Sequence, residues 1–184
     1  MLKVVRFKIF LCISVTCLGS CATVPARDYP PLEVVSKVNI NKYLGKWYEI
    51  ARYPNWFQEN CYTAIANYEL TENGSIKVVN RCRQGGFDGK TIEAVGVASS
   101  VDERSNAKLK VSFYWPFYSN YWIIALGDNY EYAVVSEPKR QCLWILSRTP
   151  VMEKWFYDKL VKYLEEKHFD ISLLIYTSQS KYYK

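Results

Sequence analysis

Residues 63–81 read TAIANYELTENGSIKVVNR, and this stretch decides the fold class of the chain. On both sides of Asn73-Gly74, residues suited to a buried face occupy every second position. A period of two is the pattern of a strand with one buried face, and Asn-Gly is a strong signal for a tight hairpin turn. The stretch therefore predicts two antiparallel strands joined by a short turn.

The same alternation returns at residues 92–98 and 108–113. Apolar segments at 47–53, 121–126, 130–136 and 141–147 bring the number of predicted strands to eight. The joins are short and contain no helix, so consecutive strands are expected to be antiparallel. We predict an all-β fold, an eight-stranded antiparallel up-and-down barrel, because closure removes both sheet edges. A β-sandwich is the structural alternative.

One amphipathic helix is expected after the eighth strand, starting at Thr149-Pro150, because proline suits the first helical position. Its apolar side is predicted to pack against the outside of the barrel and comprises Met152, Trp155, Phe156, Leu160, Tyr163 and Leu164. Residues 171–176 are apolar again and predict a short ninth strand.

The first twenty residues have the pattern of a targeting segment. A basic start is followed by an apolar stretch at 9–18, which is too short to span a bilayer permanently. It ends in Leu18-Gly19-Ser20-Cys21, which resembles the lipobox of bacterial lipoproteins. The resemblance implies removal of residues 1–20 and attachment of acyl chains such as palmitate to Cys21. The alternative is an ordinary secretory signal that happens to end in a cysteine.

By the same resemblance, Ala22 in place of an aspartate favours a lipid anchor in the outer membrane, facing the periplasm. Residues 21–38 lack periodicity and contain three prolines, so we expect a lipidated tether there. Residues 39–184 form the predicted barrel domain. Loss of the leader's three cations lowers the formal net charge from +6 to about +3, and no dense run of Lys or Arg remains, so nucleic acid is not an expected partner.

Besides Cys21, the mature chain keeps Cys61, Cys82 and Cys142. Cys61 and Cys82 flank the predicted hairpin, so we predict a disulfide between them and expect Cys142 to be a small buried hydrophobe. None of the three has C-x-x-C spacing, and His168 is the only histidine of the chain. We therefore expect neither a metal site nor a cofactor.

Three motifs occur in order along the predicted strands. Gly45-Lys46-Trp47 opens the first strand, Gly127-Asp128-Asn129-Tyr130 joins the sixth to the seventh, and Arg148 follows the eighth. They resemble the signatures of the lipocalin family, although Gly127 stands where the second signature has threonine. Residues 43–52, 110–118 and 143–150 resemble in particular the bacterial, Blc-like branch of outer-membrane lipoproteins. The resemblance covers roughly residues 39–178.

The signature residues are expected to be structural. They are Gly45, Trp47, Asp128, Tyr130 and Arg148. Trp47 would plug the closed end of the barrel, and Arg148 would lie over its indole as a cation–π contact worth roughly 0.5–2 kcal/mol.

An eight-stranded barrel holds one small ligand if its inward residues leave room. Small residues on the predicted inner face leave that room, and apolar residues line it. The predicted ligand-binding residues are Ala51, Ala66, Tyr68, Ile76, Val78, Ala94, Gly96, Ala98, Leu109, Val111, Phe113, Tyr121, Ile123 and Trp144. The alternative is a filled core in which the large aromatic side chains occupy the space. Glu49 and Asn80 are the inward polar candidates.

Tryptophan and phenylalanine gather in the joins predicted at the open end, at residues 56–57, 87 and 115–118, and are absent from the joins at the closed end. Such a rim suits an amphiphile whose head lies near Arg52, Arg83 or Lys139. It also suits contact with a bilayer or with a second barrel in a homodimer, because exposed apolar patches commonly mark interaction sites.

An apolar lumen favours long acyl chains. The resemblance implies a membrane-anchored lipocalin that binds and stores or transports a fatty acid, lysophospholipid or similar amphiphile, and that is not an enzyme. Three alternatives stay open: a lipocalin-like enzyme acting on a lipophilic substrate, sequestration of haem or hydrophobic toxins, and a purely structural envelope protein. The catalytic alternative has little support, because the single histidine has no serine or cysteine motif nearby.

Overall fold

The computed structural model describes residues 29–180, so the predicted leader and Cys21 lie outside the described residues. The strands of the described residues pair antiparallel with one another. The strands are β1 (Gly45–Arg52), β2 (Cys61–Leu70), β3 (Ile76–Gln84), β4 (Thr91–Ser100), β5 (Lys108–Tyr114), β6 (Phe117–Leu126), β7 (Tyr132–Ser136), β8 (Leu143–Ser147) and β9 (Ile175–Tyr176). The helical elements are α1 (Ile40–Tyr43), η1 (Trp56–Gln58), α2 (Lys154–Glu166) and η2 (Ile171–Leu173).

The sheet closes on itself. Its order runs from β2 through β8 to β1, and β1 pairs in turn with β2, so eight strands form a barrel to which β9 adds a short edge. This confirms the predicted up-and-down barrel and excludes the sandwich. The predicted ninth strand is shorter than expected, because η2 occupies residues 171–173.

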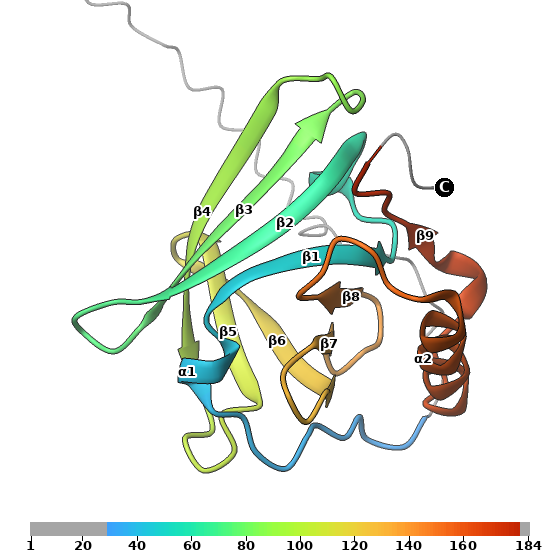
Figure 1. Cartoon of the computed structure of the whole chain (residues 1–184). Helices are drawn as coiled ribbons and strands as arrows, with labels where there is room; N and C mark the ends of the chain where they lie inside the picture. The colour runs from blue at the N-terminus through green and yellow to red at the C-terminus, as the bar shows by residue number, and fades with distance from the viewer. Residues whose placement is uncertain (1–28, 181–184) are drawn as a thin grey trace, which may run out of the picture.

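The barrel is closed more tightly at one end than at the other. β1 pairs with β2 through residues 45–48 only, and β4 pairs with β5 through residues 97–100 only. Beyond these segments the upper halves of β2, β3 and β4 rise together away from β1, as Figure 1 shows. We call this the open end. The other end, where α1 lies beside the start of β1, is the closed end.

Helix α2 covers the outside of the barrel (Figure 1). It buries Leu160 and Leu164 in a cluster with residues of β1, β6, β7 and β8. It begins at Lys154 rather than at Pro150, so the predicted start is wrong. Trp155 is 68% exposed, against the prediction that it packs on the barrel. Trp155 precedes Leu160 by five residues, whereas residues on one helical face are three or four apart.

The chain before the barrel is not a free tether over its whole predicted length. Leu32 and Val38 are buried, the Val35 amide donates to the Ile123 carbonyl at 3.0 Å, and the Val38 amide donates to the Ser105 carbonyl at 2.7 Å. Residues 29–38 therefore pack along the barrel wall, and the predicted tether over residues 21–38 is wrong for that part.

The disulfide between Cys61 and Cys82 is confirmed, with 5.5 Å between the two Cα atoms. It ties the start of β2 to the end of β3. Cys142 is half-buried rather than fully buried as expected. Within residues 29–180, no helix is long and apolar enough to cross a membrane.

Candidate functional site

The floor of the barrel is built on Trp47. This residue is fully buried, and its indole Nε1 donates to the Tyr43 carbonyl at 2.8 Å. Helix α1 is held across the closed end, since the Asn39 amide donates to the Tyr130 hydroxyl at 2.8 Å. Tyr130 belongs to the β6–β7 join, in which Asp128 is exposed. These contacts make the closed end a sealed base.

Arg148 lies over the outer face of this base. Its guanidinium donates to the carbonyls of Lys46 and Lys42 at 2.7 Å each, of Tyr43 at 3.2 Å and of Tyr130 at 3.3 Å. Gly45 has φ +90°, and a Cβ there would lie 3.5 Å from the Arg148 Nη1. The signature residues thus fix the floor and leave the lumen to other side chains.

Three tyrosines fill the space above the floor. The Tyr121 hydroxyl lies 2.7 Å from that of Tyr43 and 2.8 Å from that of Tyr68. Burial raises the pKa of Tyr68 to about 12 and also raises the pKa values of Tyr43 and Tyr121. The three hydroxyls are therefore neutral hydrogen-bonding groups, and the filled-core alternative holds for this lower part of the barrel.

Above the tyrosines, the inner wall is apolar. Strand pairing places Val78 beside Gly96 and Tyr68, and Ile76 beside Ala98. The predicted lining residues that belong to this buried cluster or pack against it are Ala66, Tyr68, Ile76, Val78, Ala98, Leu109, Val111, Tyr121, Ile123 and Trp144. Most residues that the sequence alternation predicts for the inner face of the barrel therefore lie on that face in the structure.

The inner wall becomes accessible toward the open end. Asn80 pairs with Ala66 and Ala94 in the next row up, where Ala66 and Asn80 are half-buried and Ala94 is exposed. Phe113 is 43% exposed and lies against Gly96, where an added Cβ would come within 2.8 Å of its ring. The upper wall is thus lined by small residues and one aromatic ring, and solvent reaches it.

Ala51 does not line the lumen, which corrects its prediction as a ligand-binding residue. The pairing of β1 with β8 shifts between Glu49 and Ala51, so a bulge displaces the alternation by one residue. Ala51 pairs with Ile145 and is buried with it in the cluster beneath α2. Arg52 then pairs with Trp144 and points toward the interior side.

A buried polar network lies on this part of β1. One Glu49 carboxylate oxygen accepts from the Thr177 hydroxyl at 2.6 Å and lies 3.3 Å from the Arg52 Nε, and the other accepts from the Gln58 amide at 2.6 Å. The Gln58 Oε1 accepts from the Trp144 indole at 2.9 Å. Burial raises the pKa of Glu49, and these hydrogen bonds and Arg52 oppose the shift. Sequence analysis flagged Glu49 and Arg52 but missed Gln58 and Thr177.

The C-terminal segment closes the gap where β1 and β2 part. The Thr177 amide donates to the Ile50 carbonyl at 2.8 Å. The Gln179 amide nitrogen donates to the Glu49 carbonyl at 2.6 Å and to the Ala64 carbonyl at 2.9 Å, and so bridges the two strands. We call residues 177–179 the seam segment.

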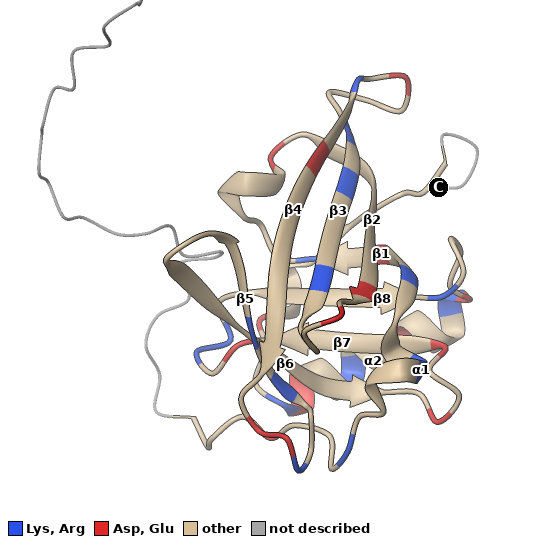
Figure 2. Ribbon diagram, turned by 90° about the vertical axis from the view of Figure 1, so that its left-hand side faces the viewer, with Lys and Arg blue, Asp and Glu red and all other residues tan. Residues whose placement is uncertain are grey.

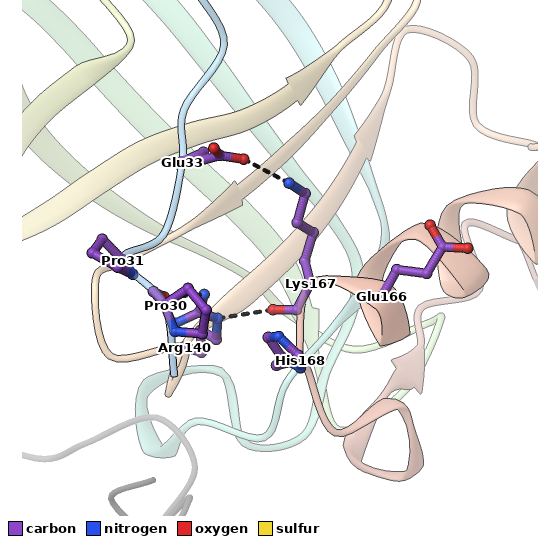
Figure 3. A pocket seen from close by; sticks show the side chains of 7 residues that line it. All are labelled: Pro30, Pro31, Glu33, Arg140, Glu166, Lys167 and His168. Atoms are coloured by element: carbon purple, nitrogen blue, oxygen red, sulfur yellow. Dashed lines mark hydrogen bonds and ion pairs between the residues drawn. The ribbon is translucent and has the colours of Figure 1, made fainter. Parts of the chain in front are cut away.

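A hollow lies outside the barrel, where the described chain begins. Figure 3 shows it between the first described residues, the β7–β8 join and the end of α2. Its volume is about 400 Å³, and its lining is Pro30, Pro31, Glu33, Arg140, Glu166, Lys167 and His168. Lys167 pairs with Glu33 at 2.7 Å, and the Arg140 guanidinium donates to the carbonyls of Lys167 and Pro30 at 2.9 Å each. These contacts of Glu33, Lys167 and Arg140 hold the first described residues against the end of α2 and the β7–β8 join, so we interpret the hollow as a contact between chain segments rather than as a ligand site.

A sealed floor, an apolar wall and an accessible upper end are the geometry of a calyx. The model of the lipocalin-like domain matches residues 38–179. The chain belongs to the lipocalin family.

This lipocalin is 39% identical to the outer membrane lipoprotein Blc of Vibrio cholerae over 175 residues, which cover 93% of this chain and 98% of that one. It is 40% identical to temperature-induced lipocalin-1 of Arabidopsis thaliana, over 81% of this chain and 83% of that one. Among solved structures, insecticyanin of the tobacco hornworm Manduca sexta superposes with a TM-score of 0.67 at 21% identity, over 84% and 87% of the two chains. That last likeness supports the fold alone.

Proposed function

We propose that this lipocalin binds an amphiphilic lipid, such as a fatty acid or a lysophospholipid, with the acyl chain inside the barrel and the head group at the open end. The chief support is the gradient along the inner wall. Tyr43, Tyr68 and Tyr121 fill the base, whereas the row of Ala66, Asn80 and Ala94 is small and accessible. A cup with an apolar wall and few polar groups suits an acyl chain.

Asn80 is the polar group best placed to orient such a ligand. It lies between Ala66 and Ala94 on the upper inner wall, and its Oδ1 has no hydrogen-bond partner. A buried acceptor without a partner costs free energy, and a hydroxyl of a bound lipid would satisfy it. Glu49, in contrast, is already bonded to Thr177 and Gln58, so we assign it a structural role.

We further propose that acylation of Cys21 holds the protein in the outer membrane, facing the periplasm, after removal of residues 1–20. The support is the lipobox-like sequence and the similarity to a protein named as an outer membrane lipoprotein. Mass spectrometry of the protein purified from membranes tests this proposal. It should show an acylated N-terminal Cys21, and Cys21→Ala should release the protein from the membrane fraction.

Binding is tested by displacement of a fluorescent fatty acid with oleate and with lysophosphatidylcholine. Ala94→Trp fills the upper lumen from an accessible position and should weaken binding by at least about tenfold, or about 1.4 kcal/mol. Val95→Trp is the matched control, because Val95 is the next residue of β4, pairs with Val79 rather than with Asn80, and is 51% exposed. Equal binding by both variants would contradict the lumen as the ligand site.

The same assay separates binding from catalysis. We propose that the protein is not an enzyme, and the family resemblance supports a binding protein. Incubation with lysophosphatidylcholine should therefore return the lipid unchanged, with the bound lipid recovered intact by mass spectrometry. Release of free fatty acid in proportion to protein would contradict this part of the proposal.

A further inference from the structure

Large aromatic side chains are exposed around the open end. They come from the β1–β2 join, the start of β2 and the tip of the β5–β6 hairpin, and they are Trp56, Phe57, Tyr62, Tyr114, Trp115, Phe117 and Tyr118. Trp56 is 67% exposed and Trp115 is 78% exposed. We call this set the aromatic rim. A group of exposed apolar rings at one end of a protein commonly marks an interaction site.

The β5–β6 hairpin also carries no charged residue near its tip. No Asp, Glu, Lys or Arg occurs between Lys110 and Asp128, and the projecting hairpin carries neither charge colour in Figure 2. Elsewhere on the view in Figure 2, charged residues of both signs are spread over the strands and joins. Moving the hairpin from water into a less polar environment therefore costs little desolvation free energy, because no charge has to be desolvated.

The closed end lacks such a surface. Among the described residues, its strands and strand joins expose Leu70, the last residue of β2, and Val101, in the β4–β5 join, and both of these large hydrophobic residues are aliphatic. Trp155, at the start of α2, is exposed as a single residue on the helix. Scattered apolar residues of this kind are ordinary on a protein surface.

The described chain begins at the open end. The Tyr29 ring stacks on His168 with 4.8 Å between centroids, and the Arg140 guanidinium lies 5.5 Å from the Tyr29 ring. Arg140 belongs to the β7–β8 join, which is at the same end as the β1–β2 join. From there the chain runs along the barrel to the closed end, where Asn39 meets Tyr130.

Chain length limits where an anchor at Cys21 can lie. Cys21 precedes Tyr29 by eight residues, which span at most about 29 Å when fully extended. The chain itself uses the ten residues from Tyr29 to Asn39 to pass from the open end to the closed end. An anchored Cys21 is therefore tethered to the open end by fewer residues than the chain uses to reach the closed end.

We infer that the open end docks on the lipid bilayer, with the aromatic rim in the head-group region and the lumen facing the membrane. This inference rests on the proposed acylation of Cys21 and deepens the proposed lipid binding, because a mouth held on the bilayer exchanges amphiphiles with it directly. Tryptophan and tyrosine favour the membrane–water interface, where an apolar ring and a polar tip are both accommodated. Docking adds buried apolar area to the acyl anchor.

Electrostatic attraction contributes little to this docking. The open-end joins carry Asp88 and Glu137 as well as Lys90 and Lys139, so cations and anions are mixed there. Insertion of the rim is accordingly expected to be insensitive to salt, since screening weakens only charge–charge attraction.

The test uses the full acylated protein in vesicles of phosphatidylethanolamine and phosphatidylglycerol that contain a dibrominated phosphatidylcholine. Bromine quenches tryptophan within contact range, so the wild-type emission should fall relative to vesicles without bromine. The variant Trp56→Phe/Trp115→Phe should lose most of the quenched component. Trp155→Phe is the matched control and should keep it, because Trp155 is as exposed as Trp56 but lies away from the rim.

Flotation of the vesicles tests the acyl anchor separately from the docking of the open end. If the wild-type protein does not float, the proposed acylation fails and the docking inference falls with it. If the protein floats and quenching is the same in the rim variant and the wild type, the anchor stands and the docking inference is overturned. Cross-linking in the vesicles tests whether the rim instead contacts a second copy of the chain. That alternative predicts a cross-linked dimer, no quenching of the rim tryptophans, and loss of the dimer in Trp115→Glu/Phe117→Glu. Quenching that persists in 1 M salt and depends on the rim tryptophans supports docking.

Discussion

The guanidinium carbon of Arg148 lies 3.8 Å from the centroid of the Trp47 ring, while the same guanidinium donates to four backbone carbonyls around the closed end. One side chain therefore joins β8 to α1, to β1 and to the β6–β7 join. Helix α1 has only four residues and is too short to be stable by itself. The base of the cup is held by this contact rather than by the intrinsic stability of the helix.

Arg148→Ala should lower the free energy of unfolding by about 2–4 kcal/mol, because it removes the charged donors to these carbonyls and the cation–π contact. Arg148→Lys keeps a charge near the indole but loses the fork of the guanidinium, so its loss should be smaller but still measurable. Urea unfolding followed by tryptophan fluorescence gives both values. An Ala variant as stable as the wild type would show that the network does not support the base.

Gly96 and Phe113 predict a steric effect on the inner wall. A Cβ at Gly96 would lie 2.7 Å from the Ser112 carbonyl oxygen and 2.8 Å from the Phe113 ring. Gly96→Ala should therefore cost about 1–3 kcal/mol of stability. In Gly96→Ala/Phe113→Ala the ring no longer blocks the new methyl group, so part of the loss should be recovered. Strictly additive losses in the double-mutant cycle would contradict this explanation.

Much of the barrel is predictable from the sequence because the strands follow a period of two. The hairpin around Asn73-Gly74 forms as the pattern predicts, and Gly74 adopts φ +82° in the turn. The row of Ala66, Asn80 and Ala94 falls on the predicted inner face. These features depend on local pattern, and a single sequence contains that information.

The errors occur where tertiary contacts override the local pattern. Ala51 continues the alternation from Trp47, but the bulge after Glu49 turns it outward. Residues 29–38 have no periodicity, yet they pack on the barrel through Leu32 and Val38. The partners of Glu49 were missed because Gln58 and Thr177 lie nine and 128 residues away along the chain.

Glu49 predicts a pH dependence of stability. Burial raises the pKa of its carboxyl group above the ordinary 4.5, so the folded protein holds the proton more tightly than the unfolded chain does. Its contribution to stability is complete below the unfolded pKa and is lost as the pH rises through the folded pKa. Urea unfolding from about pH 4 to about pH 8 should thus show the stability of the wild type falling relative to Glu49→Gln, whose side chain does not titrate.

The opposite trend would identify Arg52 and the hydrogen bonds as the dominant influence on Glu49. If the wild type gained stability relative to Glu49→Gln as the pH rises, the pKa of Glu49 would be lowered in the fold rather than raised. Arg52→Gln in the same experiment separates the two contributions, because it removes the cation that lies 3.3 Å from the carboxylate. The pH-dependent loss should be larger in that variant.

The seam segment predicts a local opening of the barrel wall. Gln179 bridges the carbonyls of Glu49 and Ala64 where β1 and β2 no longer pair. Gln179→Ala leaves both carbonyls without this donor, at a cost of about 1–2 kcal/mol. Because the rest of the sheet is unaffected, the cost should appear as local opening, with faster hydrogen exchange at the Thr177 amide that donates to Ile50.

Ser178→Ala is the matched control for the seam segment, because it removes a hydrogen bond from the Ser178 hydroxyl to the Ser180 carbonyl and leaves the bridge intact. Exchange at Thr177 should stay slow in this variant, and amides in the β6–β7 pair should exchange equally in both variants and the wild type. If Gln179→Ala accelerates exchange throughout the barrel, the bridge supports global stability instead of closing one seam. If it accelerates none, the seam is held by the pairing of β9 with β1 alone.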